Sequence, residues 1–237
     1  MFIPFVIDDV AWIWYYDRQG CIQSEGISFI QDFPSFLVLL YALQRLELDQ
    51  WGLNPRLDGR VEKAHQGMFG RNKNNDKIVV PTEWQVAIGS TSVTIQHGNI
   101  LHSTLGLTGR GTLSVVAKLD AGRRTEWVVV KIYWPEEVRT SEPDIVRGAK
   151  AAGKNDAEIK DHLPTVIGYE DLEYRTGSAR QALGLEDSKR GLPRSRVLRV
   201  IVFAKLSPLS SLSGENFIRA WLDCLRCKYR GSLKLYL

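Results

Sequence analysis

Short runs of β-branched and aromatic residues recur along this chain, and they constrain its fold more than any other feature. They occupy residues 10–16, 78–80, 86–88, 93–95, 113–119, 127–134 and 197–203. Such runs are typical of strands, and several short strands in succession favour an antiparallel sheet. Asp17-Arg-Gln-Gly20 follows the first run, with Asp first and Gly last as a type I turn prefers, so we expect strands on both sides of it.

Apolar residues at helical spacing predict helices between and after these strands. One helix should begin after Asp32 and Pro34 and cover a sheet with Phe36, Leu39, Leu40, Leu43 and Leu46. A short helix is expected at residues 141–152, because Pro143 is tolerated in a first turn and Gly148 costs only about 1 kcal/mol. A last helix, residues 214–229, carries one apolar face that should include a core-facing Cys224: Phe217, Ala220, Trp221, Cys224 and Leu225.

Two stretches have no such pattern. Residues 56–77 are rich in Gly, Asn, Lys, Arg and His and predict an exposed loop. Residues 153–193 form a polar stretch. The chain therefore reads as a sheet, a helix, a strand and a final helix.

Composition excludes several classes of protein. The 237 residues are 44% hydrophobic and 24% charged, which is ordinary for a globular chain and unlike collagen, coiled coils or disordered proteins. The longest apolar stretch, residues 36–43, is far shorter than the roughly 18 residues that span a bilayer, so no membrane association is expected. Three cysteines, an odd number, and no secretory signal predict an intracellular protein, cytoplasmic or nuclear. A net charge of +4 does not require nucleic acid.

The segment at residues 109–116 carries the chemistry of greatest interest. Gly109 and Gly111 leave the backbone bare, so that its N–H groups can approach a triphosphate, and Lys131 on the next strand can place a positive charge at the phosphates. Protein kinases use G-x-G-x-x-G-x-V followed by V-A-I-K for this purpose. Val116 matches the pattern, whereas Ser114 replaces the third glycine. The alternative is an ordinary hairpin with a solvated lysine.

Two further positions bear on nucleotide binding. Val129 stands where the kinase pattern has a small alanine facing the adenine, and its extra methyl groups narrow that pocket. Glu142 is placed to hold Lys131 in an ion pair, as kinases do with a helix glutamate. The alternative is that Glu142 and Asp144 only complement the positive end of a helix dipole.

Ordered pieces over nearly the whole chain resemble the fungal-type protein kinase family. They are WYYDRQG at residues 14–20, WGLNP at 51–55, GRGT at 109–112, VKIYW at 130–134, Arg139, SEPDI at 141–145, DHLP at 161–164, residues 196–203 and LSPL at 206–209. The resemblance reaches to about Tyr229. It implies an α+β fold of the protein-kinase-like type, with a small lobe made of a twisted antiparallel sheet and one helix.

The same resemblance implies three parts of the chain. A family-specific N-terminal segment, residues 1–97, would pack on the lobe. The kinase small lobe, with its phosphate loop, strand lysine, helix and hinge, would occupy residues 98–206. Residues 207–237 would be the first helix of a truncated large lobe.

Site residues carried over from the family would bind ATP. Gly109, Gly111 and Thr112 would form the phosphate loop, Lys131 would contact the phosphates and Glu142 would be its partner. The remaining nucleotide contacts would be Val116, Val129, Phe203 near the gate of the adenine pocket, and the hinge backbone of Ala204 and Leu206.

Motifs for the transfer step are missing from the sequence. Neither H-R-D-x-x-x-x-N nor D-F-G occurs, and none of the four histidines, His65, His97, His102 and His162, is followed by Arg-Asp. We therefore expect no catalytic or metal-binding residue, no magnesium, weak or lost ATP binding, and no catalysis by this polypeptide alone. The chain ends where the catalytic loop should follow, as a truncated gene product would.

Three functions stay open at this point. The first is a Ser/Thr protein kinase whose other half lies beyond the chain. The second is a pseudokinase-like scaffold that binds a protein partner through partly exposed Phe217, Trp221 and Leu225. The third is a non-functional truncated product.

Other motifs are weaker. Cys224 and Cys227 have metal-like spacing but lack the second half of a zinc site. A basic cluster is expected to be solvated in a loop, which makes a nucleic-acid partner unlikely. It consists of Lys189, Arg190, Arg194, Arg196 and Arg199.

Overall fold

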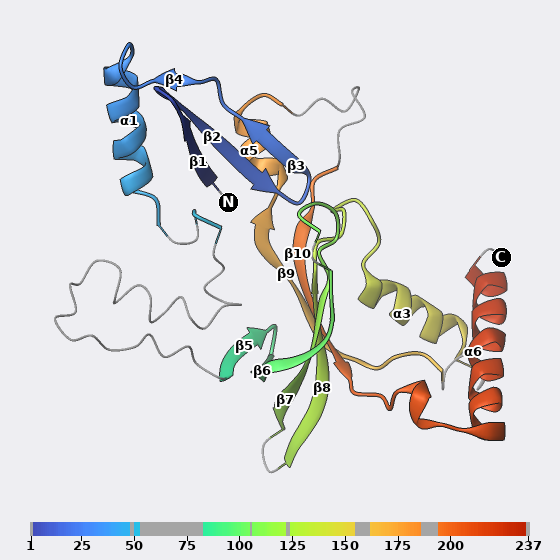
Figure 1. The fold of residues 1–237 in the computed structure, drawn as a ribbon. Helices are drawn as coiled ribbons and strands as arrows, with labels where there is room; N and C mark the ends of the chain where they lie inside the picture. Colours follow the sequence, from blue (N-terminus) through green and yellow to red (C-terminus); the bar gives the residue numbers. More distant parts are fainter. Residues whose placement is uncertain are drawn as a thin grey trace, which may run out of the picture.

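The computed structural model describes residues 2–47, 50–52, 83–104, 106–121, 124–154, 162–185 and 194–235. Within them, a small sheet contains β1 (Phe2–Ile7), β2 (Val10–Asp17), β3 (Gly20–Gln23) and β4 (Ile27–Ser28). A six-stranded sheet has the order β5-β6-β7-β8-β10-β9, and every pairing in it is antiparallel (Figure 1). The predicted loop at residues 56–77 and strand at residues 78–80 lie outside the described residues.

The turn between β2 and β3 forms as predicted. The Asp17 carboxylate accepts hydrogen bonds from the backbone N–H groups of Gln19, at 2.8 Å, and Gly20, at 3.0 Å. A short Asp side chain that binds the backbone two and three residues ahead is what favours this residue type at the start of a turn. The β2–β3 pairing is therefore encoded locally.

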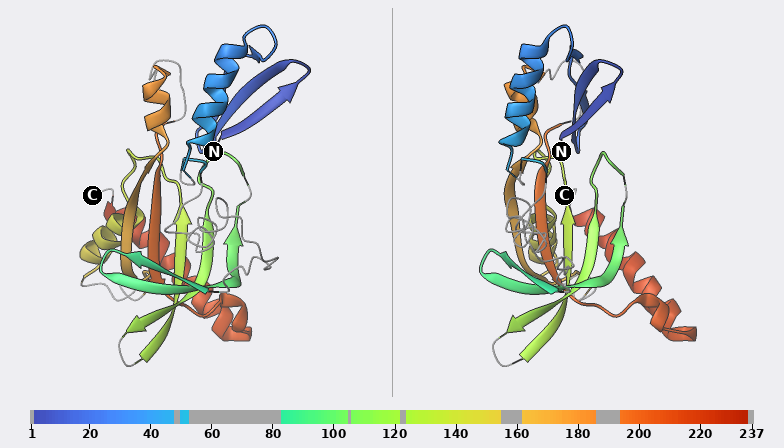
Figure 2. Two further views of the ribbon diagram at one scale, coloured as in Figure 1. Left: turned by 90° about the vertical axis from the view of Figure 1, so that its left-hand side faces the viewer. Right: turned by 60° about the vertical axis from the view of Figure 1, so that its left-hand side comes forward.

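Helix α1 (Phe33–Gln44) also begins as predicted, because the Asp32 side chain accepts a hydrogen bond from the Ser35 N–H. Its half-buried face lies beside the small sheet, where the rings of Phe29 and Phe36 are 5.4 Å apart (Figure 2). No residue of α1 is buried, however, and Val38 is 69% exposed. The predicted face therefore does lie against the small sheet, but it covers the sheet only in part, and apolar residues on the other sides of α1 remain exposed.

The large sheet is built from β5 (Glu83–Ile88), β6 (Thr91–Ser103), β7 (Leu113–Ala121), β8 (Arg124–Tyr133), β9 (Val166–Arg175) and β10 (Val197–Ala204). Its two outermost strands, β5 and β9, contact each other, and the Gly89 N–H donates to the Glu170 carboxylate at 2.9 Å. The sheet therefore curls around its own core. Alternate residues of the six strands fill that core: Val86, Ile88, Val93, Ile95, Val115, Ala117, Val128, Val130, Leu172, Leu198, Val200 and Val202.

Two elements lie in the stretch that the sequence indicated only as polar. They are β9 and the short helix α5 (Gly177–Ala182). Among the described strands, β9 pairs with β10, and of its residues Leu172 joins the buried core cluster. The sequence of β9, VIGYEDLEYR, has no apolar run longer than two residues, so it lacks the pattern by which a strand is recognised. Residue 97, the predicted boundary between the N-terminal segment and the lobe, lies inside β6.

Two helices follow the predicted pattern. Helix α3 (Glu142–Ala152) contacts β9, and helix α6 (Gly214–Leu235) follows a short 3-10 helix, η2 (Leu209–Ser211). Helix α6 is longer than expected and packs against α3 (Figure 1). The prediction that Cys224 faces the core is wrong, because Cys224 is exposed. Among the helices of the described part, none is long and apolar enough to cross a bilayer.

Candidate functional site

The loop between β6 and β7, residues 104–112, is called the glycine loop here. Gly109 has a φ of +82° and Gly111 a φ of +48°, a region that favours glycine over residues with side chains. A side chain at Gly109 would meet nothing within 4 Å, so this part of the loop is bare. The Arg110 carbonyl accepts a hydrogen bond from the Trp134 N–H at 2.7 Å, which holds the loop at the end of β8.

The register of β7, β8 and β10 brings the predicted site residues together. Directly paired residues of an antiparallel sheet point to the same face. Ser114 pairs with Lys131 at the end of the sheet that carries the glycine loop. Two residues further along the same face, one row across three strands contains three half-buried apolar side chains: Val116, Val129 and Phe203.

The ion pair predicted at the start of α3 is formed. Lys131 Nζ lies 2.6 Å from Glu142 Oε2 and 4.8 Å from the centre of the Tyr133 ring. The Lys131 and Glu142 side chains are 27% and 36% exposed, so the pair is only partly shielded from water. Asp144 is engaged elsewhere, because its carboxylate accepts hydrogen bonds from Ser141 and, at 2.7 Å, from Arg147.

The start of α3 is itself fixed by its sequence. The Ser141 Oγ accepts a hydrogen bond from the Asp144 N–H at 3.1 Å and so caps the helix. The hydrogen bond from Ser141 holds the pKa of Asp144 below its usual value. Glu142, in the first turn, also complements the helix dipole, so both interpretations of this residue apply at once.

Next to the ion pair lie two more buried groups, Tyr133 and Arg199. Tyr133 is only 5% exposed, and burial raises the pKa of its hydroxyl. Arg199 donates two hydrogen bonds, of 2.5 and 2.6 Å, to the Asp171 carboxylate. These bonds raise the pKa of the Arg199 guanidinium above its usual value. The interpretation of Arg199 as a solvated loop cation is therefore wrong, since it pairs across β9 and β10.

Arg196 departs from that interpretation in the same way. Its side chain is 13% exposed and donates a hydrogen bond to the Trp134 carbonyl at 2.9 Å. Arg194 is exposed. Lys189 and Arg190 lie outside the described residues. The five cations accordingly do not form one solvated basic cluster.

The predicted hinge follows β10. The Ala204 N–H donates to the Thr165 carbonyl at 2.9 Å, so this donor is already used within the fold. Leu206 is 69% exposed. The Ala204 N–H is therefore not available as a hinge donor to a base.

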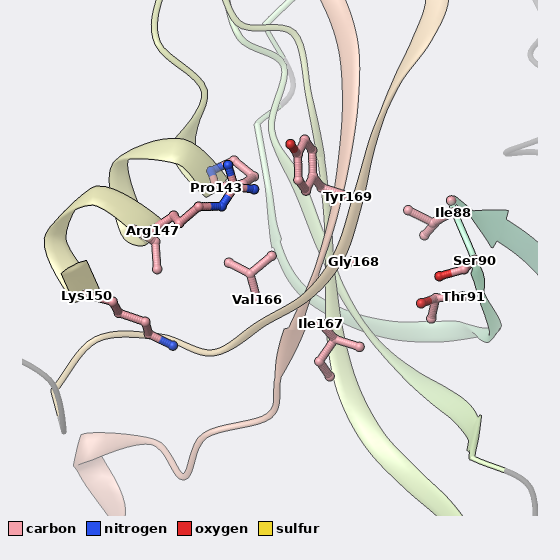
Figure 3. A pocket seen from close by; sticks show the side chains of 12 residues that line it. Ile88, Ser90, Thr91, Pro143, Arg147, Lys150, Val166, Ile167, Gly168 and Tyr169 are labelled. Atoms are coloured by element: carbon pink, nitrogen blue, oxygen red, sulfur yellow. The ribbon is translucent and has the colours of Figure 1, made fainter. Parts of the chain in front are cut away.

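A cavity of about 430 Å³ lies away from these residues, between α3, β9 and the β5–β6 turn (Figure 3). Arg147 and Lys150 from α3 and Tyr169 from β9 line it. Neither Lys131 nor the glycine loop contributes to its lining. The sequence did not indicate this cavity, because β9 was not recognised.

The sequence also missed a contact between two segments that lie far apart along the chain. The Asp17 carboxylate accepts hydrogen bonds from Arg180 of α5 at 3.1 and 3.2 Å, and both side chains are almost fully buried. The Gly109 N–H donates to the Arg18 carbonyl at 2.9 Å. The β2–β3 turn is thus bound to α5 and to the glycine loop.

Groups of three or more His, Cys, Asp or Glu that could hold a metal ion are absent from the described residues.

A protein-family model described as fungal protein kinase matches residues 5–210. No curated protein matches the chain, and no solved structure does.

Proposed function

Because the chain belongs to the fungal protein kinase family, we propose that its glycine loop and Lys131 bind the phosphates of ATP. Protein kinases hold a strand lysine in place with a helix glutamate and cover the phosphates with a glycine-containing loop. The ion pair between Lys131 and Glu142, at 2.6 Å and one strand from the glycine loop, is the observation that carries this proposal.

The electrostatics support phosphate binding at this place. The positive φ values of Gly109 and Gly111 let neighbouring backbone N–H groups turn toward an anion. Lys131 adds a full charge, and Glu142 holds the ammonium group without removing it from solvent. An anion bound between the loop and Lys131 would meet donors from both sides.

The apolar row of Val116, Val129 and Phe203 is suited to a planar base. These three side chains are half-buried and lie on the same face as Lys131, toward the predicted hinge. Val129 carries more bulk than the alanine of the kinase pattern and reduces the space for adenine. We therefore propose that ATP binds with modest affinity.

The motifs that protein kinases use for phosphoryl transfer are missing from these residues. The 237 residues contain neither H-R-D nor D-F-G, which supply the base and a magnesium ligand in protein kinases. We expect these residues alone to bind nucleotide without transferring phosphate to a Ser or Thr acceptor.

Replacing Lys131 with alanine should weaken ATP binding by about tenfold or more, since charge-assisted contacts to phosphate are among the stronger hydrogen bonds. Lys118→Ala is the matched control. Lys118 is also a strand lysine over an aromatic ring, 5.6 Å from the centre of Trp127, but it lies two rows away from Lys131. Titration calorimetry with ATP measures both variants. Equal affinities for the wild type and the Lys131 variant would disprove the proposal.

Replacing Val129 with alanine should strengthen ATP binding by about tenfold, because one or two methylene-sized groups in an apolar pocket decide roughly that much affinity. The affinity for inorganic triphosphate should stay unchanged, since Val129 lies in the apolar row and not in the glycine loop. Calorimetric titrations with both ligands test this. A change of the same size for both ligands, or none for ATP, would exclude the base from this row.

Exposed apolar residues of α6 favour a second candidate function, which is protein binding without nucleotide. Phe217 is 40%, Trp221 49% and Leu225 44% exposed, as the sequence predicted. A chain that acts only by such contact would show no thermal shift with MgATP and no effect of Lys131→Ala. The calorimetric comparison above therefore separates the two functions.

A further inference from the structure

The side chain of Arg18 reaches from the β2–β3 turn into the glycine loop. Its guanidinium donates a hydrogen bond to the Gly106 carbonyl at 2.5 Å, while its own carbonyl accepts from the Gly109 N–H at 2.9 Å. One residue of the N-terminal hairpin thus contacts the loop on both sides of its tip. The views in Figures 1 and 2 both place the β2–β3 hairpin near the loop end of the large sheet.

Gly111 provides the space for this guanidinium. A Cβ atom at position 111 would lie 2.2 Å from Arg18 Cζ and 2.4 Å from one of its terminal nitrogens. The guanidinium therefore occupies the place that a side chain at position 111 would fill. It lies directly against the backbone that we propose as a phosphate cradle.

Arg18 has no carboxylate partner among the described residues. The neighbouring Asp17 is directed to Arg180, at 3.1 and 3.2 Å. The bond to Gly106 uses one of the five N–H donors of the guanidinium, and partial burial lowers the pKa of Arg18. A partly desolvated cation without a carboxylate partner creates a positive potential that a bound anion would balance.

We propose that Arg18 is a second cationic ligand for the nucleotide, so that the N-terminal hairpin supplies part of the phosphate site. This inference rests on the proposed function and extends it to a residue outside the kinase motifs. The planar guanidinium can donate two parallel hydrogen bonds to a pair of phosphate oxygens, whereas the Lys131 ammonium group cannot. The contribution of Arg18 should consequently grow with the number of phosphates on the ligand.

The test measures the affinities of adenosine, ADP, ATP and inorganic triphosphate by calorimetry for the full chain. Arg18→Gln should lower the affinities for ATP and triphosphate by about tenfold, and the affinity for adenosine by less than about twofold. Arg18→Lys should lie between the wild type and Arg18→Gln. Arg139→Gln is the control, since Arg139 is an exposed arginine paired with Glu136 at 3.0 Å, and it should change none of the four affinities.

A second variant displaces the guanidinium without removing its charge. Gly111→Ala should push the flexible end of Arg18 aside. It should lower the affinity for ATP about as much as Arg18→Gln does. Adding Gly111→Ala to Arg18→Gln should then lower the ATP affinity by less than the product of the two single effects, because both changes remove the Arg18 contact; the remainder reports the strain of a side chain at the φ of +48°. Circular dichroism spectra that match the wild type show that the variants are folded.

Several outcomes would overturn the inference. An equal loss for adenosine and ATP would make Arg18 a clamp for the loop and not a phosphate ligand. Unchanged ATP affinity in Arg18→Gln, with a clear loss in Lys131→Ala, would overturn the role of Arg18 and leave the proposed function intact. Failure of the wild type to bind ATP or triphosphate would overturn both.

Discussion

Replacing Asp17 with alanine should lower the free energy of unfolding by about 3–5 kcal/mol, because the Arg180 guanidinium would remain buried without its partner. The two side chains are only 5% and 10% exposed, and Arg180 donates two hydrogen bonds to Asp17. Asp17 also closes the β2–β3 turn through the N–H groups of Gln19 and Gly20. Its loss would release the N-terminal hairpin from α5.

Urea denaturation followed by circular dichroism measures this effect. Asp17→Asn keeps an oxygen acceptor for the turn and removes only the charge. This variant should therefore show most of the decrease in the free energy of unfolding that Asp17→Ala shows. The control is Glu215→Ala in α6, whose 2.8 Å pair with Arg219 is exposed and should be worth less than about 1 kcal/mol. Losses of similar size for Asp17 and Glu215 would show that burial does not strengthen the Asp17 pair.

Replacing Ile201 with alanine should lower the free energy of unfolding by about 2–5 kcal/mol, since the variant loses buried apolar contacts and leaves a cavity. Ile201 is 0% exposed and pairs with Lys131 on β8 and Tyr169 on β9. It lies in the same row of the sheet as Lys131. The cavity should therefore also weaken nucleotide binding through the packing of this row.

Ile100→Ala is the matched control, because Ile100 is 54% exposed on β6 and should change stability by less than about 0.5 kcal/mol. The two variants are compared by urea denaturation and then by ATP titration. If Ile201→Ala were as stable as Ile100→Ala, the face of the sheet that carries Lys131 would not be closely packed.

Local chemistry explains which elements could be predicted. The Asp17 turn, the Asp32 cap and the Ser141 cap each depend on a side chain that binds backbone a few residues away. The strands β5, β7, β8 and β10 carry apolar runs because their alternate residues fill the core. Such features can be predicted from the sequence because all the residues that produce each of them lie within a short stretch of the chain.

The predictions that are wrong concern residues whose burial depends on an element far away in the sequence. Arg199 was interpreted as a solvated loop cation, yet the Asp171 carboxylate on β9 makes its burial possible. The pattern of β9 does not indicate a strand, because its apolar residues are interrupted by charged ones and only Leu172 among them belongs to the buried core cluster. Cys224 lies on an apolar face of α6 that remains exposed, and helical spacing alone does not show whether a face is covered.

The amino-acid sequence by itself determined the strands around the glycine loop, the position of Lys131 and the helix that begins at Glu142. These features depend on contacts within about a dozen residues, and the observed ion pair spans 11. Only the tertiary structure decided that Asp17 meets Arg180, 163 residues away, and that Arg18 reaches Gly106, 88 residues away. Such long-range contacts follow from the way the curled sheet, α5 and the N-terminal hairpin pack together, which no local pattern records.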